Sequence, residues 1–66
     1  MIERKIAEQF LHKNVVINYE DDNQDRITKG IITEVTENSI LLDYRDSNQA
    51  ISLKIINFIR EVPNND

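Results

Sequence analysis

The residues that could support catalysis are few and scattered along this chain. His12 is the only histidine, and Ser39, Ser47 and Ser52 all lie far from it in the sequence. A nucleophilic hydroxyl needs a general base beside it, and the single glycine cannot form a glycine-rich phosphate loop. We therefore expect no enzymatic activity and no cofactor. His12 is interpreted as a surface residue near the end of a helix, and metal ligation is the alternative.

A second group of candidate residues is the acidic stretch at residues 20–25. Carboxylate oxygens bind hard cations, but this stretch lacks the ligand spacing and the central glycine of an EF-hand loop. We interpret it as a solvated hairpin turn and expect no metal site, with cation binding as the alternative. The carboxylates concerned are Glu20, Asp21, Asp22 and Asp25.

Base stacking needs an aromatic residue, and phosphate contacts need basic residues beside it. Tyr44 followed by Arg45 is the one adjacent pair of that kind in the chain. The alternative is that Tyr44 closes the edge of a sheet and that Arg45 is only a turn residue. The formal net charge of −4 argues against strong non-specific binding of nucleic acid, but it leaves a local site open.

The elements that must position these residues follow from the spacing of the apolar side chains. Ile2, Ile6 and Phe10 recur every four residues, which predicts an amphipathic helix over about residues 2–12. From residue 14 onward, β-branched residues and short alternating patterns predict an antiparallel series of strands. The strands are expected at residues 14–19, 27–35, 39–44, 50–53 and 58–62.

The polar segments between these strands are typical of tight turns. Pro63 ends the last strand and starts a tail over residues 63–66. Phe10 and Phe58 are expected in the core, and the edge strands are expected around residues 40–44 and 58–62. Turns are expected at residues 20–25, 36–38 and 45–48, and a bend or a single helical turn at residues 53–57.

Length and composition describe a single small domain. The chain has 66 residues, of which 39% are hydrophobic and 30% charged, and it contains no cysteine. Charged residues interrupt the N-terminal segment, so it lacks the apolar core of a signal peptide, and no apolar run is long enough to span a membrane. We expect a cytoplasmic, mainly β protein: a helix over about 2–12, a strongly bent five-stranded barrel over about 14–62, and the tail.

Gly30 is the only glycine, and it falls inside the longest predicted strand. A small barrel bends its sheet sharply, and a strand glycine permits such a bend because it has no Cβ. We therefore interpret Gly30 as a structural residue that lets the strand curve, with an incidental glycine as the alternative.

The order of segments resembles the Sm-like small barrels of SH3/Sm type, in particular the bacterial Hfq type. The resemblance covers about residues 2–62: a short helix, NVVINYED, a turn, KGIITEVTENSILLDY with its glycine, a turn, and AISLKIINFIREV. The C-terminal barrel of the YolD-like bacterial proteins has much the same layout. The resemblance implies a non-catalytic module that binds RNA in post-transcriptional regulation and that assembles into a ring through its edge strands.

The Hfq type carries a Lys-His pair before its final strand. Here the place reads Leu53-Lys54-Ile55, so a lysine remains and the histidine is absent. Asn38 stands nearest to the Asp or Asn that Sm proteins place in the second turn. The resemblance therefore points to Asn38, Tyr44 and Lys54 as remnants of a uridine site, with Arg45 beside them.

Two functions are compatible with these residues. The first is the RNA-binding module, as a homo-oligomer joined through edge strands. The second is a protein-interaction or regulatory adaptor of the same barrel class, without nucleic-acid binding, which recognises a protein partner by strand addition or through an acidic face. The net charge and the missing histidine favour the adaptor, whereas the layout of the fold favours the RNA binder.

Overall fold

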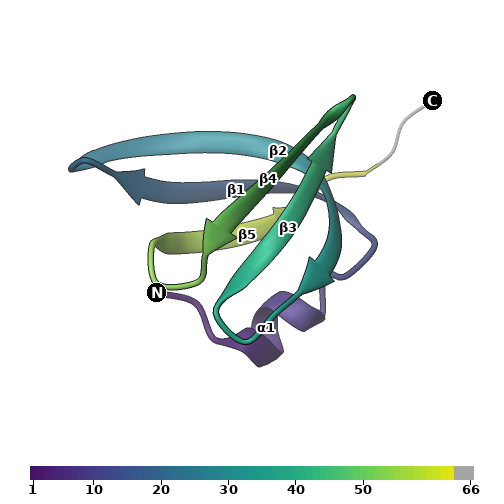
Figure 1. The fold of residues 1–66 in the computed structure, drawn as a ribbon, viewed down its shortest axis with the longest axis horizontal. Coiled ribbons are helices and arrows are strands. Elements are labelled where there is room, and N and C mark those ends of the chain that lie inside the picture. The colour runs from purple at the N-terminus through teal and green to yellow at the C-terminus, as the bar shows by residue number, and fades with distance from the viewer. Residues whose placement is uncertain (64–66) are drawn as a thin grey trace.

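The computed structural model describes residues 1–63 as one short helix and five strands (Figure 1). The expectation of a mainly β chain with an N-terminal helix and five antiparallel strands is confirmed. Of the expected tail, residues 64–66 lie outside the described residues. The elements are α1 (Arg4–Glu8), β1 (Asn14–Asp21), β2 (Gln24–Val35), β3 (Ser39–Tyr44), β4 (Ser47–Ser52) and β5 (Ile56–Glu61).

The five strands form one open sheet in the order β4-β3-β2-β1-β5. Within residues 1–63, β4 and β5 are its two edges and do not pair with each other. The edge expected around residues 58–62 is confirmed, but the edge expected at 40–44 is wrong, because β3 pairs with both β2 and β4. The β3–β4 hairpin crosses the β1–β2 hairpin (Figure 1), and the Thr28 hydroxyl donates to Gln49 Oε1 at 3.4 Å between them.

α1 is shorter than the helix expected over residues 2–12. After its last residue, the next three amides bond to carbonyls three residues earlier, which is a tighter path than an α-helix. His12 then turns the chain with a φ of 67°, and its amide donates to the Ile32 carbonyl at 2.7 Å. The predicted apolar stripe is partly wrong as well, because Ala7 is fully buried and Ile6 is 41% exposed.

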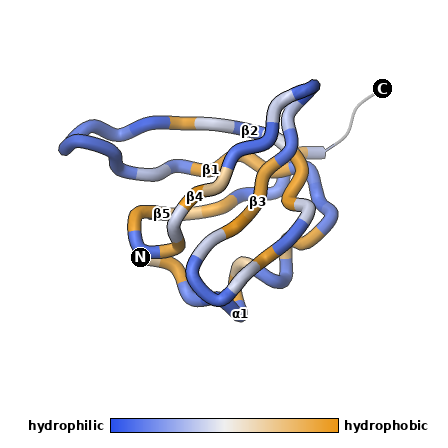
Figure 2. Tube along the Cα trace, in the orientation of Figure 1, coloured by the Kyte–Doolittle hydropathy of each residue, from blue (hydrophilic) through white to orange (hydrophobic). Residues whose placement is uncertain are grey.

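The β1–β2 hairpin is a long arm that extends away from the rest of the molecule (Figure 1). Its strands run through most of the acidic stretch, so the turn expected at residues 20–25 is reduced to Asp22 and Asn23. Both have positive φ, 52° and 62°, which a two-residue turn of type I′ requires and which Asp and Asn tolerate. Figure 2 shows that the tip of this arm is hydrophilic.

Gly30 lies where β2 passes from its pairing with β1 to its pairing with β3. Both pairings include Ile31, the next residue. Gly30 has a φ of 154°, and a Cβ built on it would lie 2.6 Å from the carbonyl oxygen of Asp43. No side chain fits at that distance, so the glycine lets β3 approach β2 closely where β2 curves (Figure 1).

Two β-bulges decide which apolar residues reach the core. The pairing of β2 with β3 passes over Thr33, so Ile32 and Val35 both pack on the core although they are three residues apart. The pairing of β5 with β1 passes over Asn57, with the same consequence for Ile56 and Ile59. Each bulge reverses the alternation of faces along its strand.

Phe58 lies on the outer side of β5 and is 46% exposed, so its expected place in the core is wrong. The bulge before it explains the difference, since the inner positions are taken by the isoleucines on either side. Phe10 is partly buried and packs against the core. The buried core consists of Ala7, Val15, Ile17, Ile32, Ile40, Leu42, Ile51, Leu53, Ile56 and Ile59.

β3 and the turn before it were predicted best. β3 occupies residues 39–44 and the turn before it residues 36–38, both as expected. The Thr36 hydroxyl holds this turn by accepting hydrogen bonds from the amides of Asn38 and Ser39, at 3.3 and 3.0 Å. The bend expected at residues 53–57 is shortened to a turn at residues 53–55, because β5 already begins at Ile56. The turn expected at residues 45–48 is reduced to residues 45 and 46, because β4 begins at Ser47.

Candidate nucleic-acid interface

The four predicted contact residues lie in two pairs at opposite ends of β3. Asn38 precedes the first residue of β3, whereas Tyr44 is its last residue. Six residues of strand separate the ends by roughly 16–20 Å. Arg45 accompanies Tyr44, and Lys54 lies with Asn38 beside the other end. The four residues therefore do not form one site, and each pair is described separately.

Tyr44 is the centre of the first pair. Its ring is flanked by two cations, with Lys29 Nζ at 5.4 Å and Arg45 Cζ at 5.2 Å from the ring centroid. Both distances are within the range of a cation–π interaction. Tyr44 remains 38% exposed, so part of the ring is accessible to solvent. Lys29, Tyr44 and Arg45 are called the aromatic-basic platform below.

Local backbone geometry brings the platform together. Arg45 has a φ of 56° in the two-residue turn that follows β3, and its guanidinium lies over the ring. Lys29 comes from β2 and precedes Gly30, where the Asp43 carbonyl of β3 lies close to β2. A hollow of about 310 Å³ lies beside the ring, lined by β1 and β2 residues such as Val16 and Ile27.

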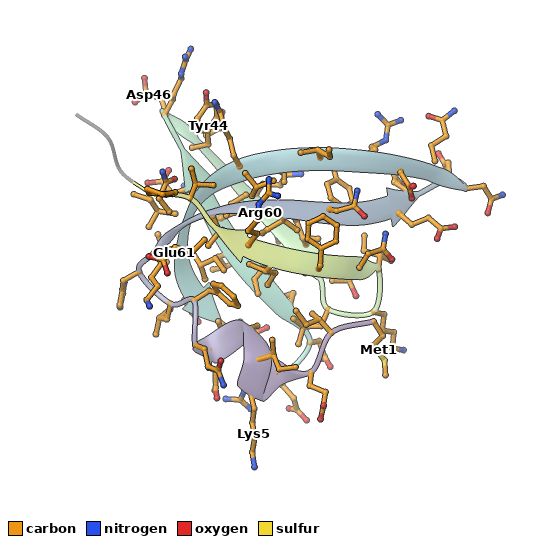
Figure 3. All side chains as sticks on the ribbon, turned by 180° about the vertical axis from the view of Figure 1, so that it is seen from behind. Met1, Lys5, Tyr44, Asp46, Arg60 and Glu61 are labelled. Atoms are coloured by element: carbon orange, nitrogen blue, oxygen red, sulfur yellow. The ribbon has the colours of Figure 1, made fainter. Side chains whose placement is uncertain are left out.

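A third cation lies on the same face as Lys29. Strand pairing places Arg60 of β5 next to Val16 and Val16 next to Lys29, so the two basic side chains share one row across the sheet. Arg60 lies at the centre of the face seen in Figure 3, with Tyr44 at one end. Asp46 follows Arg45 in the same turn and offsets one positive charge. The platform and Arg60 together supply three cations, although the formal net charge of the chain is −4.

Asn38 and Lys54 line a different hollow of about 570 Å³, between the N-terminal segment and two turns. The turns are joined because the Leu53 amide donates to the Asn38 carbonyl at 2.9 Å. The N-terminal segment is held there by the bond from the Ile2 amide to the Leu53 carbonyl, at 3.1 Å.

The charges around this hollow are balanced. Glu3 and Glu37 line it together with Arg4 and Lys54. Arg4 is further engaged by Glu8, with 3.1 Å between its Nε and the carboxylate oxygen. This hollow therefore offers no excess of positive charge for a phosphate backbone, in contrast to the platform.

The other candidate residues from the sequence, in the acidic stretch, at His12 and at the serines, take part in local structural contacts. Asp21 forms an ion pair with Arg26, with 3.6 Å between Asp21 Oδ2 and Arg26 Nε. Over residues 1–63, no group of three or more potential ligands is arranged to hold a metal ion. The side chain of His12 is exposed, and its backbone amide joins the segment after α1 to β2 by a hydrogen bond. The hydroxyls of Ser39 and Ser52 lie within turn hydrogen-bond networks, Ser52 accepting from the Lys54 amide at 3.2 Å.

Sequence reasoning missed Lys29 and Arg60 as members of the same basic surface as Arg45. They come from β2 and β5 and are far apart along the chain. The position of Lys29 directly before the strand glycine is a weak signal of its place in this surface, since the glycine marks a close approach of another strand. No local signal identifies Arg60, because its position depends on the register between β5 and β1.

Comparison with known protein families, with curated proteins and with solved structures finds no match for this chain. In the part of the chain that the structure describes, no helix has the length and apolar character needed to cross a bilayer.

Proposed function

We propose that the chain is a non-catalytic binding module of the Sm-like small-barrel class that binds single-stranded RNA. The observation that carries the proposal is the aromatic-basic platform, a partly exposed tyrosine with two cations 5.2–5.4 Å from its ring centroid. Tyr44 would stack on a base, while Lys29 and Arg45 would contact phosphates on either side. A regulator of RNA in the cytoplasm is the role that such a module would fill.

The arrangement of the sheet supports this class. Sm-like barrels have a short helix, a long curved second strand with a glycine, and a single tight turn between the last two strands. The chain has α1, Gly30 in the twelve-residue β2, and the turn at residues 53–55. Its two edges, β4 and β5, are free to pair with another subunit. We therefore include assembly through β4 and β5 in the proposal.

Fluorescence anisotropy with U-rich and A-rich oligonucleotides tests RNA binding. Affinity should fall as salt rises, because phosphate contacts release counterions. Tyr44→Leu should weaken binding about tenfold or more, given the ~1–3 kcal/mol of one stacked base. Arg45→Gln should weaken it less and reduce the salt slope. Lys5→Gln, on the far side of the molecule in α1, is the matched control and should leave affinity unchanged.

An absence of binding to both RNAs at low salt would overturn the RNA proposal. The second candidate, a protein-interaction adaptor, would then be favoured, because the chain combines a net charge of −4 with two unpaired sheet edges in the described residues. Light scattering separates assembly states: a hexamer or heptamer supports a ring joined through β4 and β5, whereas a species without edge pairing leaves those edges open for a peptide strand.

A further inference from the structure

Strand pairing orders the outer face of β1, β2 and β5, which is turned away from the core, in rows across the strands. Pairing aligns Phe58, Asn18 and Ile27 in one row, called the apolar row. The next row toward the hairpin tip contains Glu20 and Asp25, which pair with each other, and is called the acidic row. Among the described residues, Tyr44 of β3 contacts this face at Lys29, and the apolar and acidic rows are left uncovered.

The neighbouring row in the other direction contains Arg60, Val16 and Lys29 and is called the basic row. Successive rows on one face are two residues, or about 6.6 Å, apart. The acidic and basic rows therefore lie at equal distances on either side of the apolar row. When a second copy of this face is turned so that its strands run in the opposite direction, its basic row lies opposite the acidic row of the first copy. The face is therefore complementary to itself.

The isolated chain leaves the acidic and apolar rows without partners among the described residues. Glu20 and Asp25 are directly opposite each other, and like charges in that position destabilise a strand pair. Neither forms an ion pair with any residue from 1 to 63. In the apolar row, Ile27 is 72% and Phe58 46% exposed. Both the repulsion and the exposed apolar surface would be relieved by a cation-bearing, partly apolar partner.

We propose that this face docks a second copy of the chain. The two-fold axis lies within the interface, runs across the strands and passes through the apolar row. Rotation about this axis stacks each strand on its own copy, reverses its direction and brings the two apolar rows together. Asp25 then faces Lys29 of the second copy, and Glu20 lies between Arg60 and Lys29 of the second copy.

Asn18 is the polar residue of the apolar row, and it can be buried in the dimer contact. The Asn18 amide donates to the Arg26 carbonyl at 3.3 Å, and its carbonyl oxygen accepts from the Asn57 amide at 2.7 Å. Asn18 therefore brings its own hydrogen-bond partners into the contact. Because the contact is face to face, it leaves the edges of β4 and β5 free, and the dimer does not depend on edge pairing.

The small area of the outer face limits the expected affinity of the dimer. The eight-residue β1 and the two strands beside it cover at most roughly 26 by 14 Å, less than the ~800 Å² per partner of a standard interface. We therefore expect a weak, reversible dimer whose association depends on salt, since its charged rows lie at the rim. Sedimentation equilibrium between about 10 μM and 1 mM, the range of weak complexes, should detect it.

Charge exchange tests the predicted contact directly. Asp25→Lys should raise the dissociation constant about tenfold or more, because it places two cations opposite each other. Combining Asp25→Lys with Lys29→Asp should return the constant to within about threefold of the unmodified chain, since the pair is restored with reversed sign. Ile27→Glu should also weaken the dimer about tenfold by placing two carboxylates in the apolar row.

The matched controls are Glu34→Lys on the same strand and Ile6→Glu on α1, which lie outside the face and should not alter association. The unmodified chain should also dissociate more readily as salt rises from about 0.05 to 0.5 M. A monomer at the highest concentration would overturn the proposal. It would equally be overturned by a concentration-dependent doubling of mass that is unchanged in Ile27→Glu, since a ring joined through β4 and β5 has a six- or sevenfold mass and not a doubled one. A double exchange that does not restore the doubling would also overturn it.

Discussion

The two faces of the three strands β1, β2 and β5 both carry apolar side chains and have opposite roles. On the inner face, Val15 and Ile17 of β1 are fully buried. On the outer face, Ile27 and Phe58 are 72% and 46% exposed. Both faces carry large apolar side chains, so hydrophobicity alone does not distinguish them. The inner face is the core because the β3–β4 hairpin and α1 pack against it.

Burial in this small domain therefore depends on which face of the sheet another segment covers. The outer face has rows of acidic, apolar and basic residues, whereas the buried residues of the inner face are all apolar. Substitutions on the inner face should therefore change the free energy of unfolding. Those on the outer face should mainly change association or ligand binding.

Gly30→Val should give the largest loss of stability. The new Cβ would lie 2.6 Å from the Asp43 carbonyl oxygen, at a φ of 154°. Steric overlap and backbone strain together should lower the free energy of unfolding by about 2–6 kcal/mol. Urea denaturation followed by circular dichroism measures this change. Lys29→Val, the adjacent residue on the outer face, is the matched control. Equal midpoints for the two variants would contradict the close approach of β3.

Ile17→Ala should lower the free energy of unfolding by about 2–5 kcal/mol, because it leaves a cavity at a fully buried position. Ile27→Ala, the same chemical change on the outer face, should cost less than about 0.5 kcal/mol when measured on dilute, monomeric protein. Denaturant titration of both variants compares the two faces directly. A loss at Ile27 as large as that at Ile17 would show that the outer face is covered in the monomer.

Asn57→Ala should have a smaller effect than Gly30→Val or Ile17→Ala. It removes the 2.7 Å hydrogen bond that the Asn57 amide donates to Asn18, at an exposed position of the bulge. We expect a loss of about 0.5–1.5 kcal/mol in the free energy of unfolding, typical of one such bond. Asn48→Ala on β4, an exposed amide without a hydrogen-bond partner among the described side chains, is the control. A loss above that of Ile17→Ala would contradict the assignment of the outer face as energetically minor.

The strands themselves were largely predictable because their signals are local. Alternating apolar residues end at polar turn formers, and this gave β3 at Ser39–Tyr44 and the turn at residues 36–38 without error. The helix was overestimated, since a four-residue period does not reveal that the chain tightens after Glu8 and leaves the helix at His12. The proximity of Arg45 to Tyr44 was also visible in the sequence, because the two residues are adjacent.

By itself, the sequence determined the number and order of the elements and the position of the strand glycine, since alternation, turn chemistry and the absence of a Cβ act over a few residues. Tertiary structure alone decided which face is buried. The bulges at Thr33 and Asn57 reverse the alternation, and they exist only through pairing with distant strands. For the same reason, only the fold brought Lys29 to Tyr44 and aligned acidic, apolar and basic rows on the outer face.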